Sequence, residues 1–158
     1  MNPIVIKNTK WEFSKLNLNQ NLEEIKKTAQ AFSDKWKNSK EYLDSPLKLK
    51  EALDEYELLT RKYGTTGDRG YYLCLKSFLE KDNPEIKAEY NKINDFGKEV
   101  NDLIRFFTLR IARIAEAKQK QFLESKELKK YEHLLEISFK NAKYLLSEEA
   151  EKVLEYKE

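Results

Sequence analysis

The feature that most constrains the fold is a stretch from Pro84 to Lys118 whose apolar residues keep a helical period throughout. They recur at alternating steps of four and three, at Ile86, Tyr90, Ile93, Gly97, Val100, Ile104, Phe107, Ile111 and Ile114. This spacing keeps one apolar seam on one side of an α-helix. Asn83 can cap the first turn, where Pro84 is harmless. The pattern predicts a single helix over residues 84–118, the longest element of the chain.

The length and width of this apolar seam indicate what surrounds it. A helix over 84–118 would be about 50 Å long, whereas a compact globule of this size is about 40 Å across. The helix must therefore kink near Gly97 or form the spine of an elongated bundle. Around its middle, Phe106, Phe107 and Leu109 point in different directions. This wide apolar belt favours a multi-helix bundle over a two-stranded coiled coil.

Three helices are expected before the long one. Asn21 and Glu24 have the spacing of a capping box, and an apolar stripe follows at Leu22, Ile25, Ala29, Phe32 and Trp36. Ser45 and Pro46 start a second helix with a buried face at Leu49, Ala52 or Leu53, Tyr56, Leu59 and Tyr63. Gly64 is placed to end it. A third helix, ending before Asp82, is marked by Tyr71, Tyr72, Leu75, Phe78 and Leu79.

After the long helix the pattern breaks at residues 123–125 and resumes. A fifth helix is marked by Leu128, Tyr131, Leu134 or Leu135, and Ser138 or Phe139. Ser147 then caps a last helix whose apolar face begins at Val153 and Leu154. The expected fold is all-α: an elongated bundle of about five to six helices around the helix at about 84–118. Residues 1–158 are expected to form a single domain.

Composition excludes several classes of protein. The charged residues are 37% of the chain with a net charge of only +2, which argues against a nucleic-acid binder. The lysines at 118, 120, 126, 129 and 130 are interspersed with glutamates, which argues against RNA binding. No run approaches a membrane span, and no signal peptide is recognised. With a single cysteine, Cys74, no internal disulfide can form. We expect a cytoplasmic protein without a membrane or nucleic-acid partner.

The few residues that suggest chemistry do not form a catalytic or metal site. His133 and Glu136 have helical spacing, but His133 is the only histidine, and a helical zincin motif requires two. The spacing of Gly64, Gly67 and Gly70 fits a loop between helices better than a phosphate loop. Cys74 has no basic neighbour and is expected to be a buried, inert thiol. No catalytic, cofactor-binding or metal-binding residue is therefore predicted in this chain.

Two further groups of side chains could serve binding. An anion-binding row is conceivable at Arg105, Arg110 and Arg113, but Asp102 and Glu116 are placed for ordinary ion pairs within the helix. The nine tyrosines exceed what a small core needs. They either line seams between helices with their hydroxyls toward solvent or mark a wet groove or interface.

Several scattered motifs resemble one peptidase family. Near the start of the chain stand Trp11-Glu12-Phe13-Ser14 and Leu16. The second expected helix contributes Ser45-Pro46, Leu49, Ala52-Leu53 and Tyr56-Glu57. The C-terminal part contributes Glu127-Leu128, Tyr131, His133, Leu135-Glu136, Leu146-Ser147-Glu148-Glu149, Glu151 and Leu154. In order and spacing, these pieces are similar to the N-terminal region of the oligoendopeptidase F branch of the thimet-type zinc metallopeptidases.

The resemblance implies an N-terminal fragment of a longer peptidase. In that family such a helical region forms a wall or lid of a deep channel that admits short peptides. The channel closes over a zinc ion held by a His-Glu-x-x-His helix, which this sequence lacks. The chain would then gate substrates without being active alone, with the absent catalytic domain as its partner and residues 147–158 as the start of the connection. The alternative is a free-standing helical module that binds a partner protein.

Overall fold

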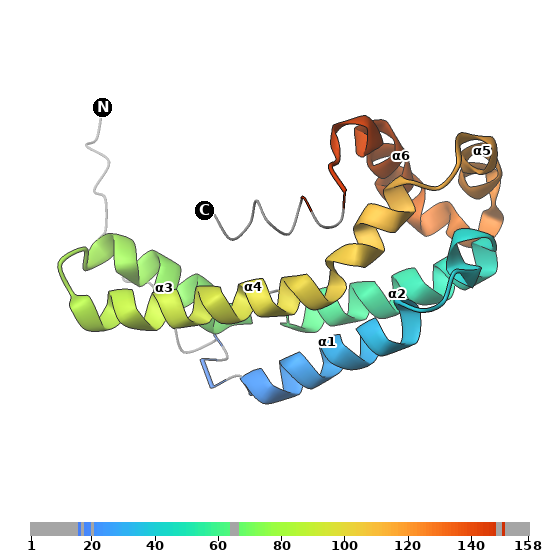
Figure 1. Ribbon diagram of the computed structural model, residues 1–158. Coiled ribbons are helices and arrows are strands. Elements are labelled where there is room, and N and C mark those ends of the chain that lie inside the picture. Colours follow the sequence, from blue (N-terminus) through green and yellow to red (C-terminus); the bar gives the residue numbers. More distant parts are fainter. Residues whose placement is uncertain (1–15, 17, 20, 64–66, 148–149, 151–158) are drawn as a thin grey trace, which may run out of the picture.

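The structure is a computed structural model that describes residues 16, 18–19, 21–63, 67–147 and 150. Within these ranges the chain forms helices and no strand. The order is α1 (Leu22–Trp36), η1 (Glu41–Leu43), α2 (Pro46–Tyr63), α3 (Gly67–Leu79), α4 (Pro84–Ala112), α5 (Glu116–Glu124), η2 (Lys126–Tyr131), α6 (Glu132–Asn141) and η3 (Ala142–Tyr144). Figure 1 shows an elongated arrangement along α4. The predicted all-α bundle is confirmed, and none of the described helices is long and apolar enough to cross a bilayer.

The spine is α4, and it begins as predicted. The Asn83 side chain accepts hydrogen bonds from the backbone N–H groups of Glu85 and Ile86, which satisfies donors that a helix start leaves free. Its predicted end at residue 118 is wrong, because the helix stops at Ala112. Ala115 has extended backbone angles, and α5 starts after it. The break turns the chain so that Ile114 is buried in the core while α5 leaves in a new direction.

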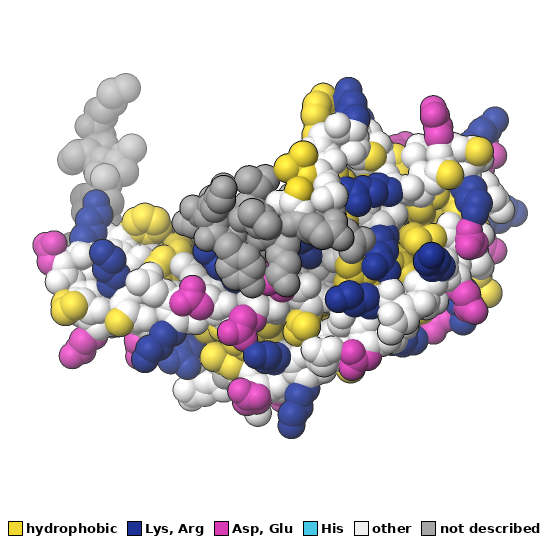
Figure 2. Space-filling model, viewed as in Figure 1, with side chains coloured by type: hydrophobic (Ala, Val, Ile, Leu, Met, Phe, Trp, Pro, Cys, Tyr) yellow, Lys and Arg dark blue, Asp and Glu magenta, His cyan; other side chains and the backbone are white. Residues whose placement is uncertain are grey.

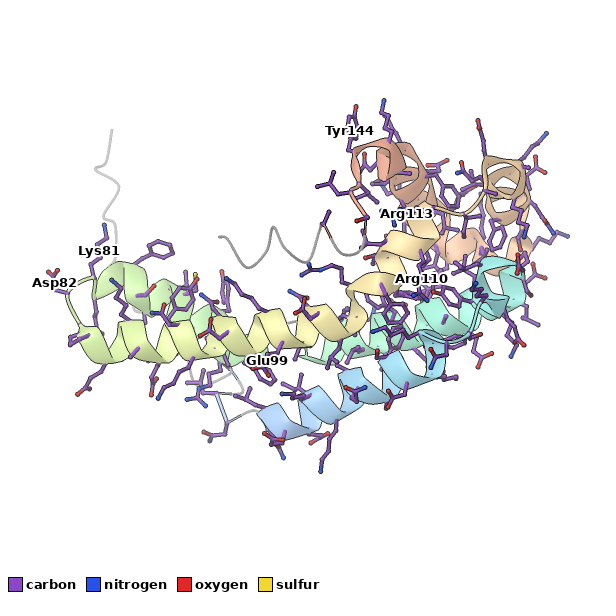
Figure 3. All side chains as sticks on the ribbon, in the orientation of Figure 1. Lys81, Asp82, Glu99, Arg110, Arg113 and Tyr144 are labelled. Atoms are coloured by element: carbon purple, nitrogen blue, oxygen red, sulfur yellow. The ribbon has the colours of Figure 1, made fainter. Side chains whose placement is uncertain are left out.

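A bend in α4 lies beyond Gly97. In Figure 3, Glu99 lies on the straight part of the helix and Arg110 on the part that turns away, so the bend falls between them. The Thr108 hydroxyl donates to the Arg105 carbonyl over 3.1 Å. A hydroxyl that bonds to the preceding turn in this way commonly bends a helix. The helix was expected either to form the spine of an elongated bundle or to kink near Gly97. It forms the spine and also bends, but the bend lies beyond Gly97.

The core gathers aromatic rings around the second half of α4. Phe107 is fully buried. Its ring centroid lies 5.1 Å from that of Phe32 on α1, 5.4 Å from Tyr42 on η1 and 5.1 Å from Tyr56 on α2. The predicted buried faces of α1 and α2 are therefore confirmed for their main residues, while the side chain of Tyr63 and all of Gly64 lie outside the described residues.

The helix α3 exists as predicted, but most of the apolar residues that marked it in the sequence are not buried. Gly70 and Leu73 are buried, whereas Tyr71, Phe78 and Leu79 are exposed. Gly67, at φ 58°, opens the helix, so Gly67 and Gly70 belong to α3 and not to a loop. Figure 1 shows why the face is open: α3 lies against the first half of α4 and extends beyond α1 and α2. Among the described elements, none covers Tyr71, Phe78 and Leu79, although the sequence pattern placed these residues in the helix.

The elements α5, η2, α6 and η3, which we call the arm, pack at the turned end of α4. The predicted break is confirmed, because α5 ends at Glu124 before an extended Ser125. The predicted fifth helix is divided into η2 and α6. Leu128, Tyr131 and Leu135 are buried, and Leu134 is exposed. Phe122 from α5 is also fully buried, so the arm is packed firmly onto the bundle.

Candidate functional site

A groove of about 400 Å³ lies between α1 and α2. Phe32 and Leu59 are buried at its floor, and Leu58 stands exposed at its edge. The lining residues are Glu24, Thr28, Ala31, Phe32, Lys35, Glu55, Leu58 and Leu59. A hollow with an apolar floor and a few polar groups is the usual form of a site for a small ligand or a side chain.

The charges at one end of the groove neutralise one another. The Lys35 ammonium contacts Glu55 and lies 3.1 Å from Glu51. The indole N–H of Trp36 donates to Glu55 over 2.8 Å. The hydrogen bonds to Glu55 and Glu51 raise the pKa of Lys35, so the ammonium stays charged and is not a candidate base. The groove can accept an apolar group, but these residues do not supply acid–base chemistry.

A second polar site joins α2 to η2. The Tyr131 hydroxyl lies 2.6 Å from Asp54 Oδ1 and 2.7 Å from Glu57 Oε2. Lys130 contacts Glu57 and lies 3.8 Å from Asp54. Lys50 is also bonded to Asp54, one helical turn away. We call these five residues the tyrosine–carboxylate cluster.

The electrostatics of this cluster indicate a structural role, in which it holds η2 against α2. Hydrogen bonds from Lys50 and then Tyr131 lower the pKa of Asp54. Lys130 and then Tyr131 lower the pKa of Glu57 in the same way. Burial, together with the two adjacent carboxylates, raises the pKa of Tyr131. Both acids are therefore held ionised and the phenol is held protonated, which is the reverse of what a general acid and a tyrosinate nucleophile require.

A third candidate is an exposed apolar strip at the end of the arm. Its members are Leu134, Ile137, Tyr144 and Leu146, and we call it the α6–η3 face. Leu134 and Ile137 stand three residues apart on one side of α6. Tyr144 is 72% exposed, and Figure 3 shows it at the tip of the arm, pointing outward. Figure 2 shows hydrophobic side chains reaching the surface there and over α3. Val153 and Leu154, where the sequence predicts the start of a last apolar face, lie outside the described residues.

The residues singled out in the sequence for metal and thiol chemistry do not assemble into a site. His133 Nδ1 lies 3.8 Å from Glu136 Oε2, and the histidine side chain is 85% exposed. Among the described residues, no three His, Cys, Asp or Glu side chains could together hold a metal ion. Cys74 is half-buried and not fully buried as predicted.

Two arginines of α4 and Arg113, the residue directly after it, differ in their contacts. Arg105 lies 3.5 Å from Asp102, as predicted. Arg110 donates to the Lys37 carbonyl over 2.6 Å, and its guanidinium lies 5.0 Å from the Phe106 ring centroid. Arg113 donates to the carbonyl of Leu146. Both of these acceptors are more than thirty residues away in the chain, so no local sequence signal could have indicated them.

The tyrosine–carboxylate cluster was also missed in the sequence, although Tyr131 was expected on a buried face. Its partners stand 74 and 77 residues earlier. A weak signal existed: Asp54 and Glu57 lie three residues apart, on one side of α2. The sequence left two roles open for the tyrosines, in seams between helices or at an exposed groove or interface, and the structure shows both placements. Tyr42 and Tyr131 are buried in seams, whereas Tyr71 and Tyr144 are exposed.

Comparison with known proteins relates the C-terminal part of this chain to one family. Residues 110–158 match the family model described as Oligopeptidase F. Over 150 residues, 93% of this chain, the sequence is 27% identical to an oligoendopeptidase F homolog from Borreliella burgdorferi. The chain spans 25% of the length of that protein. No solved structure matches the chain. The matches confirm the predicted resemblance: this chain is similar to an N-terminal domain of an oligopeptidase F-type peptidase.

Proposed function

We propose that this chain is a non-catalytic wall or lid domain of a zinc metallo-oligopeptidase, and that it restricts access to a channel for short peptides. The catalytic zinc would be held by a His-Glu-x-x-His helix in a separate part of the polypeptide. The partner of the present domain would be that catalytic domain. The resemblance to the oligopeptidase F family and the span of only a quarter of the curated relative support this proposal.

The observation that carries the proposal is the α6–η3 face. It lies within the residues that the family model matches. Four large apolar side chains of this segment are exposed, at Leu134, Ile137, Tyr144 and Leu146. Exposed large apolar side chains that gather near one another favour a contact with another protein body. In the proposal the catalytic domain covers this face, and the rigid arm sets the position of the domain above the channel.

The first test examines the chain and its coding sequence. The isolated chain should cleave no short peptides and bind no zinc at a one-to-one ratio, since a catalytic zinc takes about three protein ligands. The coding sequence should continue beyond residue 158 into a His-Glu-x-x-His motif. Stoichiometric, tightly bound zinc in the isolated chain would contradict the proposal, as would a stop codon directly after Glu158.

The second test addresses gating in the complete polypeptide. Ile137→Glu should loosen the docked domain and so change the relative rates of cleavage of short and long peptides. Glu136→Lys is the control, since Glu136 is an exposed residue of the same helix that lies on another side from Leu134 and Ile137. Equal behaviour of the two variants would show that the α6–η3 face is not the contact. Circular dichroism of each variant distinguishes lost docking from lost folding.

One observation favours the alternative of a free-standing interaction module. The exposed Tyr71, Phe78 and Leu79 on α3 lie far from the α6–η3 face (Figure 1). A partner protein could bind there without any peptidase domain. If Phe78→Glu abolished a physiological protein contact and Ile137→Glu did not, the module would be the better description.

A further inference from the structure

The bend in α4 divides the described structure into two parts. On one side of the bend, α3 and the first half of α4 pack together as a helical hairpin (Figure 1). On the other side, the second half of α4 packs with α1, η1 and α2 in the core cluster. The arm is fastened to this second part, because Tyr131 bonds to Asp54 and Glu57 on α2. We call the two parts the hairpin and the core half.

Helix α1 lies alongside α4 across this bend. The Lys26 ammonium bonds over 2.6 Å to the carboxylate of Glu99, which stands on the straight part of α4 (Figure 3). At the other end of α1, Arg110 on the turned part of α4 donates to the Lys37 carbonyl over 2.6 Å. Both contacts join residues that are 73 apart in the chain. The two helices therefore run in the same direction and in register, and each rises about 16 Å between the contacts.

Aromatic rings join the two helices between these contacts. The ring centroid of Phe32 on α1 lies 5.1 Å from that of Phe107 and 6.4 Å from that of Phe106. All three side chains are buried. Helix α1 is thus attached to α4 on the straight part, on the turned part and in the stretch between them.

Of the two helices, α1 is the one that can hold a fixed geometry at this place. It is a single uninterrupted helix, and the side chain of Asn21 caps its start. In α4 the Thr108 hydroxyl donates to the Arg105 carbonyl, and a bond of this kind competes with the helical hydrogen bonds of the backbone. A change in the bend angle moves Glu99 relative to Arg110. Both contacts with α1 are therefore kept only over a narrow range of angles.

We propose that α1 is a splint that fixes the bend of α4, and with it the position of the hairpin relative to the arm. The hairpin carries the exposed side chains of α3, and the arm carries the α6–η3 face. The splint therefore sets how far apart these two apolar surfaces lie, and a partner that contacts both depends on that distance. The contact that opens most easily is the ion pair of Lys26 and Glu99, because both side chains are about half exposed. The inference does not depend on the peptidase proposal.

Distances between spin labels on the full chain test the splint. The native thiol is removed with Cys74→Ser. Labels attached after Lys81→Cys and Tyr144→Cys then report the distance from the tip of the hairpin to the tip of the arm (Figure 3). Labels attached after Leu58→Cys and Tyr144→Cys report the distance from α2 to the arm, and all three positions are exposed. The first half of α4 is a lever of about 22 Å, so a change of about 10° in the bend moves the hairpin tip by about 4 Å.

A charge reversal opens the splint at its exposed contact. Lys26→Glu sets two carboxylates against each other, and it should shift or widen the 81–144 distance distribution by about 4 Å or more while the 58–144 distribution stays unchanged. Adding Glu99→Lys exchanges the two charges and should restore the original distribution. Lys27→Glu, at the exposed neighbouring residue of α1, is the matched control and should change neither distance. An unchanged 81–144 distribution in Lys26→Glu would overturn the proposal, as would an equal change in the control or no recovery in the exchanged pair.

A second measurement applies if circular dichroism shows that Lys26→Glu does not fold. The labelled chain with Lys26 in place is then compared at about 0.05 M and about 1 M salt, because salt screens an exposed ion pair. The 81–144 distribution should shift or widen at high salt, and the 58–144 distribution should not. Equal 81–144 distributions at the two salt concentrations would overturn the proposal.

Discussion

The two halves of α4 carry similar apolar residues but very different amounts of packing. The second half, with Ile104, Phe107 and Ile111, is surrounded by α1, α2, η1 and the arm. The first half carries Ile93 and Gly97 as its buried residues and is paired mainly with α3. On α3 itself only Gly70 and Leu73 are buried, while three large apolar side chains are exposed.

This difference shows that an apolar stripe does not by itself create a core. A side chain is removed from water only when elements cover it from several directions, and a two-helix hairpin covers one side. The second half of α4 is therefore expected to hold the fold, and the hairpin of α3 with the first half of α4 is expected to open more readily. The following predictions test this contrast in order of decreasing effect.

The largest effect is expected at the centre of the aromatic core. Phe107→Ala should lower the free energy of unfolding by about 3–5 kcal/mol, because it leaves a cavity among three neighbouring rings. Urea denaturation followed by circular dichroism measures the change. A loss below about 0.5 kcal/mol would mean that the belt is not packed as described, and would remove the contrast between the two halves.

The next largest effect is expected inside the hairpin. Leu73 is the buried apolar residue of α3, and Leu73→Ala should cost about 2–3 kcal/mol, at the low end for a buried leucine because water can fill the site. Hydrogen exchange should show faster opening of α3 and of the start of α4, with the α1 and α2 amides unaffected. Uniform loss of protection over the whole chain would show that the hairpin and the core unfold as one unit.

A smaller effect, dependent on pH, is expected at the tyrosine–carboxylate cluster, which fastens the arm to the core half. Tyr131→Phe should cost about 1 kcal/mol at neutral pH. The pKa values of Asp54 and Glu57 are lowered by folding. Their stabilisation is thus present above the unfolded pKa values, about 4, and is lost as pH falls through the lower folded values. The urea midpoint of unfolding should therefore drop between pH 7 and pH 3 in both proteins, and the drop should be smaller for Tyr131→Phe than for the unaltered chain.

The smallest effect is expected on the open side of the hairpin. Phe78 is 65% exposed, so Phe78→Ala should change the free energy of unfolding by less than about 0.5 kcal/mol. The same phenylalanine-to-alanine change at positions 78 and 107 makes the two halves directly comparable. A loss above about 2 kcal/mol at position 78 would show that α3 is covered in solution, by a second chain or by another segment.

Much of the fold was predictable where the cause is local. The caps at Asn21, Ser45 and Asn83 were identified from side chains that bond to the next turn. The stripe from Ile25 to Trp36 was identified from spacing alone. The early end of α4 at Ala112 was not, because neither glycine nor proline marks it; there the burial of Ile114 and the packing of the arm decide where the helix stops.

The candidate sites were less predictable than the helices. Asp54, Glu57 and Tyr131 come together only because η2 packs on α2, and the exposed face of α3 depends on which neighbours α3 lacks. The helical class, most helix starts and the family resemblance could be read from the amino-acid sequence, since propensity, capping and apolar period act within a few residues. Which apolar faces are covered and which charges meet could be read only from the folded chain, because burial and ion pairing depend on segments that approach from far along the sequence.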